Sequence, residues 1–394
     1  MKNKTYTESA HEGKKTIVVK IGTSSLTEPD GRLSSTKVRS LSRQLAGLYK
    51  KGHHVILVTS GAIAAGYPLL GYHERPTSVP AKQASAAVGQ GLLMEEYSRY
   101  LSEEGIVAAQ LLLTRDDFSD KRRYKNAFNA LEVLLARGAL PIINENDTVS
   151  IEELRFGDND KLSAQLAAMV HADLLILVTD TDGLYTANPR EDENARHIPV
   201  IECITPEIEA MASGAGTRNG TGGMATKIAA AKLATQAGVA VAICNGSDDD
   251  VIARVIEGSV KHTLIKPHGS MKTRLQWMAF YAPTRGSVII DAGARTALCS
   301  QKRSLLPAGI RRIEGDFAAS DIVKVYDEDG VCLGRGRVNF SAEEVAKIAG
   351  MATGEVEKIF PGRKPEVIHR DDWVCELEPD DEYENNMTTT ASVT

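Results

Sequence analysis

The sequence predicts an α/β protein, namely a three-layer αβα sandwich around a mostly parallel sheet, followed by a small C-terminal β domain. Two observations predict the sandwich. Short apolar segments alternate with helical segments up to about residue 245, and these apolar segments are too uniformly hydrophobic to face water. A third observation predicts the second domain, because beyond about residue 285 short strand-like segments are separated by turns rich in Gly and Asp.

Six apolar segments are expected to form the strands of the sheet. The first covers residues 16–22 and is followed by hydroxyl side chains, and the second covers residues 54–59 and precedes Ser60 and Gly61. The remaining strands are expected at residues 106–112, 139–144, 174–179 and 239–244. Helical patterns predict helices over residues 35–51, 124–137, 160–171 and 226–237.

The domain boundaries follow from changes in composition. Residues 1–14 are polar and are expected to form a flexible leader before a first domain at residues 15–283. A helix is predicted over residues 265–281 with Trp277 as its anchor, and residues 283–286 are interpreted as a linker. The small β domain is expected at residues 286–364. The acidic, Thr-rich residues 377–394 are expected to form a disordered tail.

Composition excludes several classes of protein. The formal net charge is −6, from 46 Lys and Arg against 52 Asp and Glu, so the basic excess typical of nucleic-acid-binding proteins is absent. The five cysteines show no C-x-x-C spacing, which favours reduced thiols over disulfides or a zinc site. The sequence has no signal-peptide pattern and no apolar run of roughly 20 residues, so we expect a cytoplasmic protein without membrane contact.

Polar clusters follow several of the expected strands, at the edge of the sheet where open α/β proteins bind ligands. Lys20 lies at the tip of the first strand before Gly22 and several hydroxyls, an arrangement that could bind a phosphate or simply be a solvated strand end. After the second strand, Ser60, Gly61 and Ala62 begin a helix. Small residues there leave room for an anion, although close backbone packing explains them equally well.

A third cluster is dense in carboxamides and carboxylates. Asn144 and Asp147 follow one strand, and Asp158, Asn159 and Asp160 follow the next loop. Carboxylates bind an ammonium group and carboxamides serve either charge, so the cluster suggests recognition of a zwitterion. Asn and Asp are also common in turns for local reasons, and the residues alone leave both interpretations open.

A fourth cluster combines Thr179 and Asp180 with a Gly-rich segment that ends at Lys227. A lysine in the first turn of a helix opposes the helix dipole, which favours an anion bound at that end, although a plain Gly-rich loop is the alternative. Lys20 and Lys227 converging on one nucleotide would suit phosphoryl transfer, which needs positive charge around the transferred group. The Gly-rich segment consists of Thr221, Gly222, Gly223, Met224, Ala225, Thr226 and Lys227.

Taken together, these motifs resemble the amino acid kinase family. The matching segments are VVKIGTSSL, VTSGAIAAG, INENDTV, FGDNDKLSA, LVTDTDGLYT and GTGGMATK, which occur in the family's order between Val18 and Lys227. The resemblance is greatest to the branch that acts on glutamate, and the C-terminal part resembles a PUA domain, a small β-barrel. The resemblance therefore implies ATP-dependent phosphorylation of the γ-carboxylate of L-glutamate, the first step of proline biosynthesis.

The resemblance also implies roles for individual residues. Lys20 is expected at the ATP phosphates, and Asp158 and Asp160 are expected to organise the lysines or the metal. ATP and Mg²⁺ are the implied cofactors, and no side chain is assigned as a direct metal ligand. The residues expected to bind glutamate are Ser60, Asn144, Asp147 and Asn159. Those expected to bind ATP are Lys20, Thr179, Asp180 and the segment from Thr221 to Lys227, with Lys227 at the phosphates.

Other members of the superfamily are the nearest alternatives. Aspartokinases begin with KFGGTS where this chain has KIGTSS, acetylglutamate kinases favour Lys-x-Gly-Gly, and nucleoside monophosphate kinases of this fold lack the two polar clusters together. The resemblance further implies a homodimer or homotetramer and possible hand-over of product to a glutamyl phosphate reductase.

RNA binding is a different class of hypothesis. The PUA-like region 286–364 carries 12 basic and 11 acidic side chains, so we do not expect it.

Overall fold

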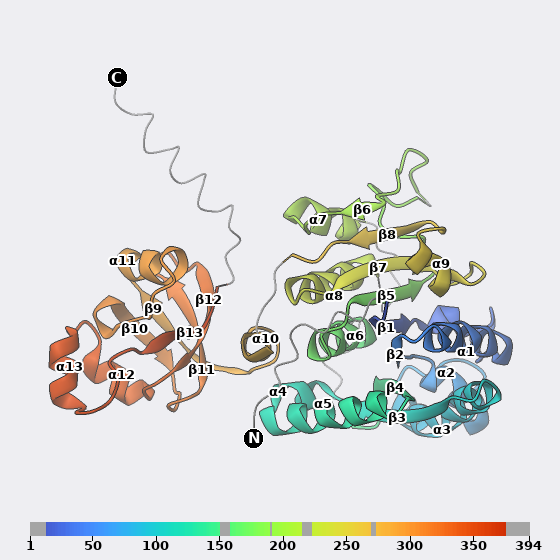
Figure 1. Ribbon diagram of the computed structural model, residues 1–394, viewed down its shortest axis with the longest axis horizontal. Helices are drawn as coiled ribbons and strands as arrows, with labels where there is room; N and C mark the ends of the chain where they lie inside the picture. The colour runs from blue at the N-terminus through green and yellow to red at the C-terminus, as the bar shows by residue number, and fades with distance from the viewer. Residues whose placement is uncertain (1–12, 150–157, 190, 215–222, 269–272, 376–394) are drawn as a thin grey trace. The chain divides into compact units, whose positions relative to one another are not determined.

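The computed structural model describes residues 13–149, 158–189, 191–214, 223–268 and 273–375 of the chain. The chain divides into two compact units, Met1–Met271 and Lys272–Thr394. The first unit contains an eight-stranded sheet and the second a five-stranded sheet (Figure 1). Most of the expected leader and the whole expected tail lie outside the described residues.

The sheet of the first unit confirms the predicted mostly parallel arrangement. Its strand order is β3-β4-β2-β1-β5-β7-β8-β6, and each neighbouring pair is parallel except β7 and β8. The two strands that were not predicted, β6 and β8, are short and lie at one end of the sheet. The strands are β1 (Thr16–Ile21), β2 (His54–Val58), β3 (Val107–Leu113), β4 (Ala139–Glu145), β5 (Leu174–Thr179), β6 (Val200–Ile201), β7 (Ala240–Asn245) and β8 (His262–Ile265).

Helices cover both faces of this sheet (Figure 1). Helix α1 contacts α3 and α9, and α6 contacts α8. None of the described helices is both long enough and apolar enough to cross a membrane. The helical elements of the first unit are η1 (Thr23–Ser25), α1 (Ser35–Lys50), α2 (Ala62–Gly66), η2 (Tyr67–Leu70), α3 (Val79–Glu103), α4 (Arg115–Ser119), α5 (Lys121–Ala136), α6 (Asp158–Met169), α7 (Pro206–Gly214), α8 (Met224–Gln236) and α9 (Val251–Glu257).

The alternation of side chains along β1 decides where its lysine lies. Ile17, Val19 and Ile21 are fully buried in a core that also contains residues of α1, α3 and α9. Successive side chains of a strand point to opposite faces of the sheet, so Val18 and Lys20 lie on the other face. Helix α6 contacts β1 there. The strand therefore carries Lys20 to the layer formed by α6 and α8.

Two glycines hold α2 tightly against α3. A Cβ atom on Gly66 would lie 1.9 Å from the carbonyl oxygen of Ser85, and one on Gly89 would lie 1.8 Å from the carbonyl oxygen of Ala62. Only glycine permits such a close approach of two helix backbones. Because α2 begins directly after the turn at Gly61, this contact also fixes α3 relative to the carboxyl end of β2.

The second unit is a five-stranded sheet in the order β10-β9-β11-β12-β13. Strands β9 and β11 are parallel, and the other neighbouring pairs are antiparallel. Helix α10 contacts β12 and β13 and therefore belongs to this unit. Its elements are α10 (Thr273–Phe280), β9 (Thr284–Ile290), α11 (Ala292–Arg295), η4 (Thr296–Ser300), η5 (Pro307–Gly309), β10 (Ile310–Gly315), β11 (Ile322–Asp327), β12 (Cys332–Val338), α12 (Ala342–Ile348), α13 (Thr353–Ile359) and β13 (Ile368–Cys375).

Two expectations for the region between the units are wrong. Ile265 ends strand β8, and the described helix begins only at Thr273, so the helix is shorter than residues 265–281. Residues 284–286 are part of β9 and do not form a linker. A Cβ atom on Gly286 would lie 2.6 Å from the carbonyl oxygen of Glu314. The glycine is therefore required by close strand packing, whereas the sequence analysis interpreted it as part of a linker.

Candidate active site

A cavity of about 680 Å³ lies at the carboxyl ends of β1, β2, β4 and β5. Its volume falls within the range of small-molecule sites, and its position is the one expected for an open α/β sheet. The four polar clusters predicted from separate parts of the sequence meet there. The predicted residues that line the cavity are Lys20, Ser60, Asn144, Asp147, Asn159, Asp160, Thr179, Asp180, Gly223, Met224 and Lys227.

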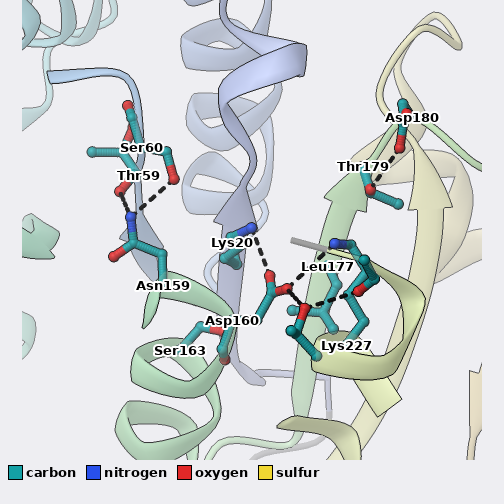
Figure 2. A network of polar contacts seen from close by, with 12 residues as sticks. Lys20, Thr59, Ser60, Asn159, Asp160, Ser163, Leu177, Thr179, Asp180 and Lys227 are labelled. Atoms are coloured by element: carbon teal, nitrogen blue, oxygen red, sulfur yellow. Dashed lines mark hydrogen bonds and ion pairs between the residues drawn. The ribbon is translucent and has the colours of Figure 1, made fainter. Parts of the chain in front are cut away.

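Two lysines share one buried carboxylate at this site (Figure 2). Lys20 Nζ lies 2.6 Å from Asp160 Oδ1, and Lys227 Nζ lies 3.3 Å from Asp160 Oδ2. Lys20, Lys227 and Asp160 are only 7%, 4% and 1% exposed. The Thr226 hydroxyl donates a further hydrogen bond of 2.9 Å to Asp160 Oδ2. One negative charge thus balances two positive charges, which leaves one positive charge in surplus.

Burial and charge act in opposite directions on the ionisable groups of this trio. Burial lowers the pKa of Lys20, the charge of Asp160 raises it, and repulsion from Lys227 lowers it again, so that the pKa lies below its ordinary value. Burial raises the pKa of the Asp160 carboxyl, but attraction to Lys20 and Lys227 outweighs this, and the pKa lies below its usual range. Asp160 is therefore ionised at neutral pH, and its charge favours the protonated form of Lys20.

A second cluster, of amides and a hydroxyl, lies at the ends of β2 and β4. Asn159 Nδ2 donates hydrogen bonds to Ser60 Oγ at 2.9 Å, to the Thr59 carbonyl at 3.1 Å and to Asn144 Oδ1 at 3.2 Å (Figure 2 shows the first two). The opposite atom, Asn159 Oδ1, is buried and has no hydrogen-bond partner among the described residues. Because a buried polar atom is rarely left unpaired, this oxygen is a site for a donor on a ligand.

The remaining wall of the cavity is the segment after β5. Thr179 is buried, and its hydroxyl donates to Asp180 Oδ1 at 3.2 Å. Gly183 has φ +141°, and a Cβ atom there would lie 2.2 Å from Thr263 Oγ1. The same hydroxyl accepts the backbone N–H of Leu184 at 2.8 Å. The segment is thereby anchored on β8, with Leu184 and Tyr185 against the cavity.

Five of the predicted residues are not seen to line the cavity. Thr221 and Gly222 lie outside the described residues, as does the side chain of Asp158, at the first position of α6. Ala225 is exposed and, like Thr226, is not part of the cavity lining. Their expected roles, at the lysines or the metal for Asp158 and at ATP for the other four residues, stay predictions.

Several lining residues were not found by sequence reasoning. Arg75 comes from the segment between η2 and α3, and Lys82 and Gln83 come from the first turns of α3. Arg75 and Lys82 add two positive charges to the cavity wall. The residues around them in the sequence form no motif that marks a ligand site, so no signal in the chain could have identified them.

Models of two known families match segments of the two units. The family model of the amino acid kinase family matches residues 15–245, and that of the PUA domain matches residues 286–360. Among solved structures, the UMP kinase from Ureaplasma parvum aligns with a TM-score of 0.42 and 19% identity, covering 64% of this chain and 99% of that one.

Curated relatives match nearly the whole chain. The glutamate 5-kinase of Streptococcus suis (strain 05ZYH33) is 51% identical over 91% of this chain and 99% of its own length. That of Streptococcus sanguinis (strain SK36) is 54% identical over 91% of this chain and 96% of its own length. That of Neisseria meningitidis serogroup A (strain DSM 15465 / Z2491) is 52% identical with the same coverage. The chain therefore belongs to the amino acid kinase family and, within it, to the glutamate 5-kinases.

Proposed function

We propose that this enzyme transfers the γ-phosphoryl group of ATP to the γ-carboxylate of L-glutamate, forming L-glutamyl 5-phosphate for proline biosynthesis. The observation that carries the proposal is the pair of buried lysines on one carboxylate, close to an amide cluster in which the Asn159 oxygen has no partner among the described residues. Phosphoryl transfer depends on positive charge around the transferred group, which the lysines supply. Recognition of an amino acid depends on polar atoms of the kind that the amide cluster presents.

The lysines counter the main obstacle to this reaction. The attacking carboxylate and the γ-phosphoryl group are both anions and repel each other. With Asp160 ionised, the trio of Lys20, Lys227 and Asp160 carries a net positive charge in a site shielded from water, where electrostatic stabilisation is strong. Because one carboxylate holds both ammonium groups, their separation is already set before substrate binds. The residues therefore do not have to reorganise when charge moves.

Mg²⁺ would accompany the phosphates of ATP and supply further positive charge at the transferred group. Asp160 fits poorly as a ligand of this ion, because both of its carboxylate oxygens lie against lysine ammonium groups and Oδ2 also accepts the Thr226 hydroxyl. We therefore assign Asp160 to the lysines rather than to the metal.

The direct test offers glutamate, aspartate and acetylglutamate side by side with Mg-ATP and hydroxylamine. An acyl phosphate reacts with hydroxylamine to form a hydroxamate, so hydroxamate is expected with glutamate and little of it with the other two acids. ADP release with glutamate in the absence of a trappable acyl phosphate would refute the proposed reaction.

Substitutions in the amide cluster are expected to weaken glutamate binding. In Asn159→Ala the substrate ammonium group loses an acceptor, and in Asp147→Asn it loses a charge on the cavity wall. A hydrogen bond to a charged group is worth roughly 1.5–3 kcal/mol, so the Kd for glutamate should rise about ten- to a hundred-fold. Calorimetric titration of each variant measures this, with the KM for ATP as the internal control. Unchanged affinity in both variants would place the glutamate site elsewhere.

The second unit is not expected to take part in the chemistry. Every residue that lines the cavity lies between Lys20 and Lys227, and the first unit ends at Met271. We expect a chain truncated after Met271 to unfold cooperatively and to phosphorylate glutamate with a kcat within about threefold of the full chain, since domains generally fold as units. Denaturant unfolding and the hydroxamate assay measure the two properties. A folded but inactive truncation would show that the PUA unit completes the active site.

The cellular setting is also part of the proposal. Phosphorylation of glutamate draws on the ATP of the cytoplasm, and the resemblance to other kinases of this family favours a homodimer or homotetramer. An acyl phosphate hydrolyses readily, so direct hand-over to a glutamyl phosphate reductase would protect the product. Light scattering of the purified enzyme, with and without such a reductase, measures both associations.

A further inference from the structure

Gln90 on α3 is connected by hydrogen bonds to the amide cluster, although it does not line the active-site cavity. Its Oε1 accepts a hydrogen bond of 2.8 Å from Asn144 Nδ2. Asn144 Oδ1 in turn accepts from Asn159 Nδ2 at 3.2 Å. The packing of Gly66 and Gly89 fixes the position of α3 just before Gln90. Gln90 is therefore the outer member of a chain of three amides that leads to the cavity.

Two backbone groups determine how these amides are oriented. The N–H of Glu145 donates to Asn144 Oδ1 at 2.9 Å, so this atom must be the oxygen. The carbonyl of Thr59 accepts from Asn159 Nδ2 at 3.1 Å, so this atom must be the nitrogen. A backbone N–H only donates and a carbonyl only accepts, which excludes the flipped amides. The Nδ2 of Asn144 consequently needs an acceptor, and Gln90 Oε1 supplies it.

We propose that Gln90 is a positioning residue for glutamate recognition: it holds Asn144, and through it Asn159, so that Asn159 Oδ1 faces the substrate ammonium group. The inference rests on the proposed function. Without the acceptor at position 90, the buried Asn144 Nδ2 has an unpaired donor. The Asn144 amide is then more stable if it turns away from position 90. Asn159 then loses one of its three fixed partners, and its free oxygen is no longer held in place.

The test compares two substitutions that differ in the acceptor. Gln90→Met keeps the length of the side chain and removes the oxygen, whereas Gln90→Glu keeps an oxygen acceptor in either protonation state. We expect Gln90→Met to raise the KM for glutamate about tenfold, with kcat and the KM for ATP within about twofold of wild type. For Gln90→Glu, kcat and the KM values for glutamate and ATP should all stay within about threefold of wild type.

A second measurement uses glutarate, which has both carboxylates of glutamate and lacks the ammonium group. If Gln90 acts through the ammonium site, Gln90→Met should change the KM for glutarate by less than about twofold. In an Asn159→Ala background, Gln90→Met should raise the KM for glutamate no further. Gln110→Met is the matched control, because Gln110 lies near Gln90 around a second cavity of about 290 Å³ and has no hydrogen bond to the amide cluster among the described residues.

Several results would overturn the inference. One is an unchanged KM for glutamate in Gln90→Met. Another is a KM for glutamate that rises as much in Gln90→Glu as in Gln90→Met. The third is a KM for glutarate that rises as much as the KM for glutamate in Gln90→Met. If Gln90→Met does not fold, Gln90→Lys removes the acceptor while keeping a long polar side chain, and the same comparisons apply. Failure of the proposed function would be distinct, because the wild-type enzyme would then form no hydroxamate from glutamate.

Discussion

Replacing Lys227 with methionine is expected to lower kcat about 10²- to 10³-fold and to leave the KM for glutamate within about twofold. The methionine keeps the apolar stem of the lysine and removes the charge. Lys227 is buried, lies beside Asp160 and lines the cavity, and under the proposed function its charge acts where negative charge develops on the transferred phosphoryl group. An interaction that strengthens in the transition state affects the rate, whereas one made equally with bound substrate affects the KM.

The stability of this variant distinguishes a catalytic role from a structural one. The wild-type site holds two lysines on one carboxylate, and Lys227→Met leaves Lys20 and Asp160 as an equal pair. We therefore expect the free energy of unfolding to stay the same or to rise, because surplus buried charge is removed. Lys232→Met, at a partly exposed lysine of the same helix that pairs with Glu209, is the matched control. A raised KM for glutamate with unchanged kcat would assign Lys227 to substrate binding.

The sequence was sufficient to predict much of the sheet and the edge on which the site lies. The strand containing Lys20 is recognisable because its side chains are apolar on both faces, and the same pattern predicts β5 with its bounds of Leu174–Thr179. Once the strands are parallel, their carboxyl ends meet at one edge, so the polar residues that follow them had to come together. Lys20, Ser60, Asn144 and Thr179 line the cavity for this reason.

Other features depend on contacts that no local pattern encodes. Gln90 is one of many polar residues on a long helix, and its position becomes meaningful only because Gly66 and Gly89 bring that helix against α2. Likewise, the sequence left open whether Asp160 orders the lysines or a metal. The distances of 2.6 Å to Lys20 and 3.3 Å to Lys227 favour the lysines.

The largest combined effect on rate and stability is expected for Asp160→Asn. The substitution leaves two buried ammonium groups without a counter-charge, and removing one partner of a buried ion pair typically costs about 3–5 kcal/mol. Burial and Lys227 already lower the pKa of Lys20, and Asp160 is the group that opposes them. In the variant the pKa of Lys20 therefore falls further, and this lysine loses its proton at a lower pH than in the wild type.

The wild-type enzyme provides the reference for this variant. The nucleophile is a carboxylate with an ordinary pKa of about 4.3, so it is ionised at neutral pH and no base is needed. We expect kcat at saturating Mg-ATP and glutamate to be nearly flat from roughly pH 6.5 to 8.5. If Asp160 were a general base, the wild-type rate would instead fall on the acidic side.

In Asp160→Asn, rate and stability should respond to pH in opposite directions. As pH rises through the lowered pKa of Lys20, the active site loses positive charge and kcat falls. Over the same range the folded protein binds fewer protons than the unfolded chain, whose lysines keep a pKa of about 10.4, so the free energy of unfolding increases. A pH–rate profile and urea unfolding at matched pH values measure the two trends. A variant with a flat profile and wild-type stability would show that Asp160 does not control the charge of the lysines.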